Sequence, residues 1–160
     1  MLSAIPQVVA RVRRLPLFVI LWLVPVWIAI GCASLAIAIV PVRRLQRLFG
    51  QSLGAVAFVP LADAAQRRRA FAIGRTIRIA ALGAPFRADC YPTAIVAQLL
   101  CRLYGVPSAL HLGVRLSSAP DDPPLYAHAW VVSGAIGVTG GRGNFGGYTP
   151  LGCWVLPTAP

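Results

Sequence analysis

A cysteine and a histidine lie 38 positions apart in the second half of the chain, each in a setting that suits catalysis by a thiol. Cys90 precedes Pro92, which is tolerated in the first turn of a helix, and an apolar run over 94–104 that Gly105 ends. The sequence therefore predicts a helix that begins at Cys90, where the helix dipole and free N–H groups favour a thiolate. His128 lies in an alternating run, 126–133, that predicts a strand on which His128, Trp130 and Val132 share one face. A cysteine on a helix start and a histidine on a later strand are the arrangement expected of a thiol hydrolase.

Each of the two residues also has a purely structural interpretation. A cysteine in an apolar chain often packs as a small buried hydrophobic residue. A histidine two positions before a tryptophan is often a core residue whose ring nitrogens are satisfied. Spacing alone does not bring Cys90 to His128, so the chemistry of the residues leaves both interpretations open.

The charge of the chain is concentrated in its first half. The 160 residues are 58% hydrophobic and only 12% charged, and all fifteen basic residues are arginine. Residues 1–84 hold eleven Arg against the single Asp63, a net charge of +10, whereas residues 85–160 hold four Arg against three Asp, a net charge of +1. This pattern suits an anionic partner such as lipid headgroups or an acidic peptide. Nucleic acid is not expected as a partner, because little aromatic sequence lies among the arginines.

The four cysteines indicate neither a metal site nor a disulfide framework. Cys32, Cys90, Cys101 and Cys153 form no CxxC pair and have no regular spacing. Reduced thiols of a cytosolic protein fit this pattern better. We expect no metal and no cofactor.

The run from Leu15 to Val40 contains no charged residue and is flanked by arginines on both sides. About 20 apolar residues suffice to cross a bilayer, so the run is a candidate for spanning or peripheral membrane insertion. Arginine on both flanks gives no orientation under the positive-inside rule. The alternative is one helix, or two short helices broken near Pro25, buried against the rest of the protein or against a partner.

The remainder of the chain predicts an α+β fold. We expect a link over 49–54, a basic helix over 61–82, and strands over 110–116, 126–133, 135–139 and 149–156. The segments 117–124 and 140–147 are predicted loops, because they are rich in Pro, Asp and Gly. A helix carrying the cysteine, followed by antiparallel strands, gives an α+β core.

Five short motifs together resemble one known family, over about residues 40–155. The chain is similar to the short form of the B protein of lasso-peptide biosynthesis, a transglutaminase-like cysteine peptidase. The motifs are Asp89-Cys90-Tyr91-Pro92, Tyr104-Gly105-Val106-Pro107, Leu112-Gly113-Val114-Arg115, His128-Ala129-Trp130-Val131 and Gly147-Tyr148-Thr149-Pro150-Leu151. The resemblance implies a transglutaminase/papain-like core over residues 53–160, with the nucleophile helix packed on a small antiparallel sheet. Residues 1–52 would form an apolar, Arg-flanked helical segment that associates with a membrane.

The resemblance also implies an activity and a set of partners. Cys90 would be the nucleophile and His128 the base of a peptidase that removes the leader from a ribosomally made precursor. The backbone N–H groups at the start of the Cys90 helix would bind the oxyanion. The expected partners are the precursor's leader peptide, a separate leader-recognition protein and an ATP-dependent macrolactam-forming cyclase, with the membrane or an exporter as further candidates. The expected location is the cytoplasm, at the inner face of the cell membrane.

The chain departs from the family at the third catalytic position. The family expects an Asp about twelve residues after the His, where this chain has Gly140, and no acidic residue follows Asp122. Thr139, Asn144 or a backbone carbonyl are the candidates to orient the imidazole. Three other functions stay open: a non-catalytic scaffold of the same complex, a thiol acyltransferase on the same fold, and a small integral membrane protein whose Cys and His are incidental.

Overall fold

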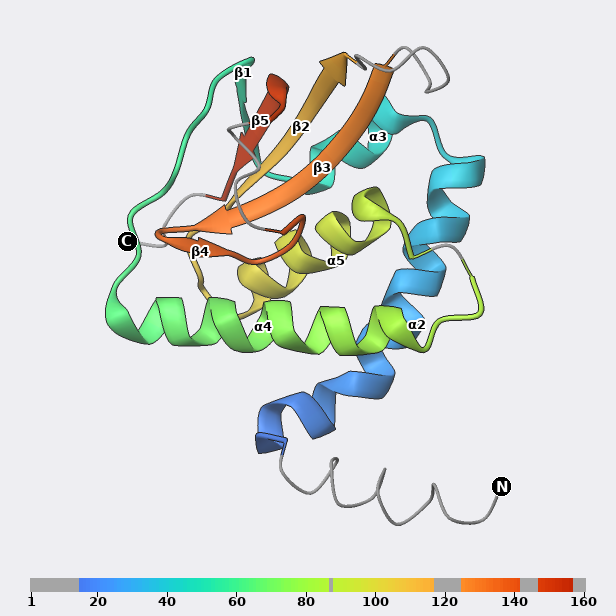
Figure 1. Cartoon of the computed structure of the whole chain (residues 1–160), viewed down its shortest axis with the longest axis vertical. Helices are drawn as coiled ribbons and strands as arrows, with labels where there is room; N and C mark the ends of the chain where they lie inside the picture. The colour runs from blue at the N-terminus through green and yellow to red at the C-terminus, as the bar shows by residue number, and fades with distance from the viewer. Residues whose placement is uncertain (1–14, 87, 117–124, 142–146, 157–160) are drawn as a thin grey trace.

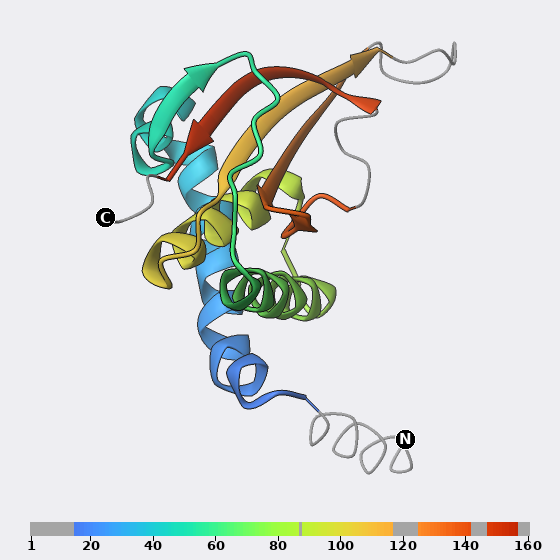
Figure 2. The same ribbon diagram turned by 90° about the vertical axis from the view of Figure 1, so that its left-hand side faces the viewer.

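The computed structural model describes residues 15–86, 88–116, 125–141 and 147–156. One five-stranded antiparallel sheet, in the order β1-β5-β2-β3-β4, lies against a layer of helices (Figures 1 and 2). The strands are β1 (Gln51–Gly54), β2 (Ala109–Leu116), β3 (Leu125–Ser133), β4 (Ile136–Gly137) and β5 (Thr149–Val155). The helices are α2 (Leu17–Ile39), α3 (Val42–Leu45), the 3-10 helix η1 (Gln46–Leu48), α4 (Ala64–Leu82) and α5 (Cys90–Leu103).

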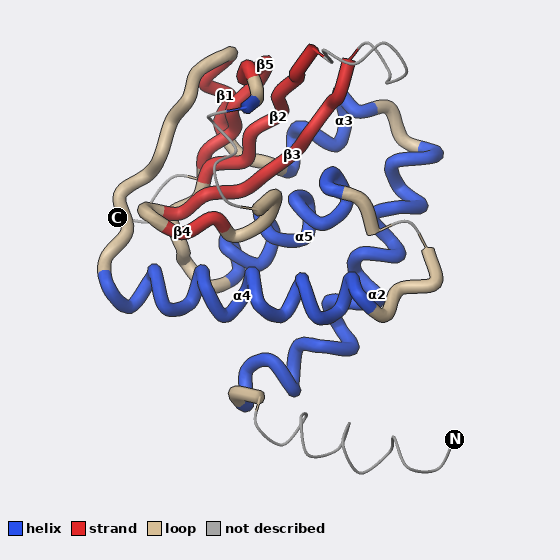
Figure 3. The backbone as a smooth tube through the Cα atoms, viewed as in Figure 1, coloured by secondary structure: helices blue, strands red, loops and turns tan. Residues whose placement is uncertain are grey.

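The predicted α+β class is confirmed, with the cysteine helix packed on a small antiparallel sheet. Helix α5 packs against β2 and β3, and α4 lies next to α5 and contacts α2 and β4 (Figure 3). The main core contains Ala97 and Leu100 of α5, Ile73 of α4, and Ala129 and Val131 of β3. Trp130 and Val132 belong to a second cluster with Ala109 and Cys153. The period-2 alternation of β3 therefore separates the two clusters as the sequence predicts.

Two segments differ from the prediction. Residues 51–54, expected within a link, form the edge strand β1, which pairs with β5 about one hundred positions away. The local sequence of residues 51–54 gives no sign of this pairing, because the partner strand is far away in the chain. The strand expected over 135–139 is only two residues long, because the N–H of Val138 and that of Thr139 both donate to the carbonyl of Val131.

Helix α2 is one continuous helix, so the alternative of two short helices broken near Pro25 is wrong. Pro25 lies inside it, and the helix packs on α4 and α5 through four buried residues, Val19, Val26, Ile30 and Ala33. By length and composition it could also cross a membrane, a property that core helices and signal sequences share. The boundary between residues 52 and 53 stays a prediction.

One buried glutamine joins α5 to three other parts of the chain. The Gln98 side-chain N–H donates to the carbonyl of Phe49 at 2.8 Å and to that of Trp154 at 3.4 Å. Its oxygen accepts from the Ser108 hydroxyl at 2.9 Å. Gln98 and Ser108 are completely buried, so these bonds lie away from water, where an unpaired amide would be costly. They fix the position of α5 relative to β5 and to the residues that lead into β1 and β2.

His111 is a buried histidine on β2 that the sequence did not single out. Its ring stacks on Trp130 with centroids 5.3 Å apart, and its Nε2 accepts the Phe58 N–H at 3.3 Å. Burial, the largest cause, lowers the pKa of His111 to about 4, because the charged imidazole is poorly solvated there.

Stability should therefore fall when the pH drops from about 6.5 towards 4. The unfolded chain binds a proton at His111 in this window and the folded chain does not, so folding is weakened as the pH falls. We expect the free energy of unfolding to drop by roughly 2 kcal/mol between pH 7 and pH 4.5 because of this residue. Urea unfolding of the wild type and of His111→Gln at both pH values measures it. Equal pH slopes for the two proteins would contradict the assignment.

Candidate active site

Cys90 is the first residue of α5, as the sequence predicts. Asp89 is the N-cap residue, but its side chain makes no capping hydrogen bond. The start of α4 differs, because there Asp63 and Gln66 form a complete capping box. Pro92 has no N–H, and the Thr93 N–H donates within the helix to the carbonyl of Asp89. The N–H groups of Cys90 and Tyr91 are therefore the first-turn donors that no side-chain cap occupies.

His128 is a half-buried residue of β3 whose ring contacts two aromatic side chains. The centroid of its ring is 4.8 Å from that of Tyr148 and 5.8 Å from that of Trp130. Its Nε2 lies 3.1 Å from the carbonyl oxygen of Gly140. Because a carbonyl can only accept, this contact assigns the ring hydrogen to Nε2. The lone pair of the neutral ring is then on Nδ1.

The partner of Nε2 comes from the position where the resemblance described above implies an acidic side chain. Gly140 supplies its backbone carbonyl in that place. The Thr139 hydroxyl oxygen, one of the predicted alternatives, accepts instead from the N–H of Val131 at 3.2 Å. Asn144, the other alternative, lies outside the described residues. Every residue has a backbone carbonyl, so the sequence could name a carbonyl partner of His128 only as one of the candidates.

One open cavity of about 340 Å³ is lined by both predicted site residues. Cys90 and Tyr91 reach it from α5, and His128 reaches it from β3. Most of the other lining residues are apolar: Val42, Leu112, Val114, Ala127, Ala129 and Leu151. The fold thus brings two residues that are distant in sequence to one cavity with an apolar lining. Such a cavity is suited to an apolar side chain of a bound peptide.

Tyr148 and Arg115 are site neighbours to which sequence reasoning gave no role. The Arg115 guanidinium lies 5.4 Å from the centre of the Tyr126 ring and 5.5 Å from that of Tyr148. Tyr148 in turn contacts the His128 ring. Both residues belong to motifs that the sequence singles out, but only the pairing of β2 with β3 and β5 brings them to the histidine.

The other cysteines lie in different surroundings. Cys101 is buried, and desolvation raises the pKa of its thiol to about 12. Burial also raises the pKa of Cys153, whereas Cys32 is exposed on α2. In the described part of the chain, no three His, Cys, Asp or Glu side chains gather to hold a metal ion.

The model of the Transglutaminase-like superfamily matches residues 34–153. The chain belongs to this superfamily. The superfamily includes cysteine peptidases and acyltransferases, and thiol chemistry is typical of its enzymes. The match covers both Cys90 and His128, and it begins inside α2. No curated protein and no solved structure matched this transglutaminase-like chain.

Brief alkylation of the folded transglutaminase-like domain should distinguish Cys32 and Cys90 from Cys101. Iodoacetamide reacts with thiolates, so exposed Cys32 and half-buried Cys90 should be modified first. Cys101 should stay unmodified until urea is added, because its pKa of about 12 leaves almost no thiolate at pH 8. Peptide mass spectrometry after a short pulse measures this order. Modification of Cys101 before Cys90 in the folded protein would contradict the described burial.

Gly74→Ala should weaken the domain through the segment that carries Gly140. Gly74 is buried on α4, and a Cβ there would collide with the carbonyl oxygen of Val138. The clash could be relieved only by moving the backbone of α4 or of Val138. We therefore expect a loss of about 1–3 kcal/mol in the free energy of unfolding. Gly83→Ala is the matched control, because its Cβ would meet nothing within 4 Å. Urea unfolding compares the two, and an equal effect of both substitutions would be the contrary result.

Proposed function

We propose that this protein is a cysteine peptidase that removes the leader from a lasso-peptide precursor. The freed N-terminal amine would then be joined by a separate ATP-dependent cyclase to close the macrolactam. One observation carries the proposal: Cys90 at the start of α5 and His128 on β3 line one cavity, with Nε2 of the imidazole held by the Gly140 carbonyl. Membership of the superfamily supports the thiol chemistry, and the five sequence motifs support the lasso-peptide role.

The proposed reaction begins with proton transfer from Cys90 to His128. Nδ1 of the neutral ring takes the thiol proton, while Nε2–H remains bonded to the Gly140 carbonyl. The thiolate attacks the scissile carbonyl, and the tetrahedral intermediate collapses to a thioester as Nδ1–H protonates the leaving amine. The same nitrogen then takes a proton from water, which attacks the thioester and releases the leader with a free carboxylate. Cys90 regains its proton from the imidazole.

The oxyanion would be bound at the start of α5. The N–H groups of Cys90 and Tyr91 are the donors in its first turn that the Asp89 side chain does not cap. Pro92 at the third position removes the next N–H, which directs the donor set to these two residues. Backbone donors fixed in a helix need no reorganisation when charge develops on the substrate oxygen.

The proposed setting is the cytoplasm, with a membrane close by. Four free cysteines suit a reducing compartment. The partners would be the leader of the precursor, a separate leader-recognition protein and the cyclase. The first 84 residues, with their net charge of +10, offer surface for an acidic leader or for the membrane.

Cys90→Ala should abolish cleavage of the precursor in the presence of the recognition protein. A thiol is the only group of this residue able to form the thioester, so we expect the rate to fall by at least about a thousandfold. Cys32→Ala is the matched control and should keep wild-type activity, because Cys32 lies on the exposed side of α2. Liquid chromatography with mass spectrometry follows the leader and core fragments.

The products also separate the alternatives. Two fragments whose masses sum to the precursor plus one water support the peptidase. A new amide instead of a free carboxylate would indicate an acyltransferase. Equal inactivity of the wild type and Cys90→Ala would reject catalysis and leave the scaffold function.

A further inference from the structure

Helix α2 has two apolar faces, and only one of them is covered by the protein. Val19, Val26, Ile30 and Ala33 form the buried face against the domain. The opposite face is a stripe of large apolar side chains at helical spacing, each between 51% and 72% exposed: Leu17, Leu21, Val24, Ile28, Leu35 and Ile39. A surface helix of a water-soluble domain normally carries polar residues there. This stripe, here called the outer stripe of α2, is therefore an apolar surface that lacks a partner within the described chain.

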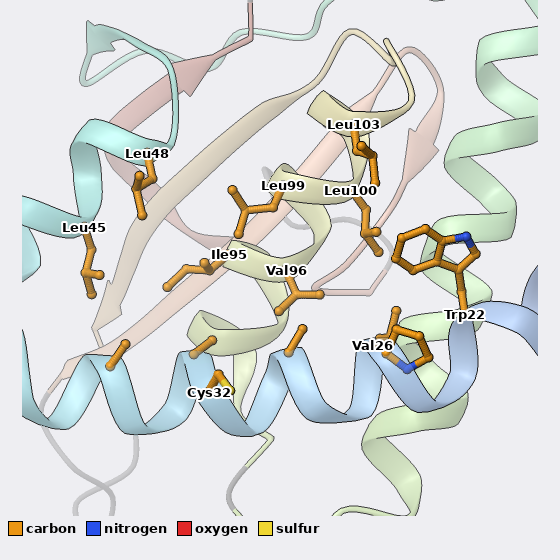
Figure 4. A pocket seen from close by; sticks show the side chains of 14 residues that line it. Trp22, Val26, Cys32, Leu45, Leu48, Ile95, Val96, Leu99, Leu100 and Leu103 are labelled. Atoms are coloured by element: carbon orange, nitrogen blue, oxygen red, sulfur yellow. The ribbon is translucent and has the colours of Figure 1, made fainter.

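An apolar groove extends the outer stripe around the helix. It lies between α2 and α5 and has a volume of about 370 Å³ (Figure 4). Trp22, Val26 and Cys32 line it from α2, while Leu99 and Leu103 line it from α5 (Figure 4). Leu48 of η1 also lines the groove. Leu99, Leu103 and Leu48 are themselves 41–64% exposed, so the groove opens to the outside.

Exposed arginines follow directly after the outer stripe. Arg43 and Arg44 on α3 and Arg47 on η1 are all exposed, and they come within eight residues of the end of α2. The only acidic residue in the first 84 positions is Asp63, at the start of α4. An apolar face with cationic groups at its end is complementary to lipid acyl chains beneath anionic headgroups.

The packing of α4 on α2 decides how the helix could meet a bilayer. Trp27, near the midpoint of α2, donates to the carbonyl of Gly83, and its ring packs on Phe86 with centroids 5.3 Å apart. Residues 83–86 are the non-helical link that follows α4. If α2 spanned the bilayer, this link would come level with the hydrocarbon centre. Exposed Arg78 would lie near that depth, because its neighbour Ile79 lines a small cavity together with Trp27. Irregular backbone exposed to lipid and an arginine at that depth are both costly.

We propose that α2 docks in the plane of an anionic membrane surface through its outer stripe and the adjoining groove. Arg43, Arg44 and Arg47 bind the lipid phosphates, and the domain stays on the aqueous side. The bound chemistry is a bilayer of anionic phospholipid, not a soluble phosphate and not a second protein. This docking does not depend on the reaction at Cys90.

Flotation of the full-length protein with vesicles tests the docking. Vesicles of phosphatidylcholine containing phosphatidylglycerol should carry the protein upward, and phosphatidylcholine alone should carry much less. Binding should weaken with rising salt, since the arginine contribution is electrostatic. Arg43→Gln/Arg44→Gln should reduce the partition coefficient roughly 30-fold, the equivalent of about 1 kcal/mol per arginine. The matched control is Arg68→Gln/Arg69→Gln on α4, for which we expect a clearly smaller loss.

The outer stripe is tested by a pair of matched substitutions at exposed leucines. Leu21→Glu on α2 should reduce vesicle binding by more than about tenfold, because it removes buried apolar area from the contact. Leu61→Glu, at a position 93% exposed before α4, should leave binding unchanged. Near-UV circular dichroism establishes that both variants stay folded.

Trp27 reports the depth of α2. It lies near the centre of the helix and is 37% exposed, whereas Trp130 and Trp154 are buried. In a Trp22→Phe background, lipids brominated near the headgroup should quench its fluorescence more than lipids brominated near the chain end.

Three results would overturn the proposal. The first is equal binding to both kinds of vesicle. The second is stronger quenching by the deep bromines, which would indicate that α2 spans the bilayer. The third is a dimer in sedimentation without lipid that Leu21→Glu dissociates, which would assign the outer stripe to contact between two copies.

Discussion

The arrangement of the site depends on the buried hydrogen bonds of Gln98. One amide on α5 binds the carbonyl of Phe49 before β1, the carbonyl of Trp154 on β5 and the hydroxyl of Ser108 before β2. Apolar packing alone would permit α5 to slide along the sheet, because hydrophobic contact has no direction. Hydrogen bonds of fixed geometry remove that freedom. The position of Cys90 relative to β3 is therefore set two turns away from it, in the interior.

The environment of His128 shows a main-chain group in the place of a carboxylate. A carbonyl can hold the imidazole in one tautomer and one orientation, as the Gly140 oxygen does. It carries only a partial negative charge, so it stabilises an imidazolium less than a carboxylate would. The ring of Trp130 stacks on the imidazole and the ring of Tyr148 contacts it at a tilt, and both restrict its rotation. In this chain, the partner of His128 therefore orients the imidazole but contributes little to stabilising the positive charge of an imidazolium.

Much of the fold could be predicted, because α5 has Pro92 in its first turn and Gly105 after its end, and because β2 and β3 alternate with a period of two. The α5 start at Cys90 and its end before Gly105, which has a positive φ, follow from residue types alone. Strand β1 could not be predicted, since its partner β5 lies at the other end of the chain. The candidate pair Cys90 and His128 followed from the predicted helix start, the predicted strand and the resemblance. The carbonyl of Gly140 and the ring of Tyr148 could not be assigned, because both depend on tertiary contacts.

The use of a peptide carbonyl beside His128 has a consequence for how the site responds to its surroundings. A carboxylate in that place would take up a proton in acidic solution and would lose the negative charge that attracts the ring N–H. The amide oxygen of Gly140 does not titrate in that range, so the imidazole keeps its hydrogen-bond acceptor there. Replacement of a side chain cannot delete the oxygen either. The position of the Gly140 oxygen depends on the backbone conformation, so only a change in that conformation would remove the hydrogen bond to His128.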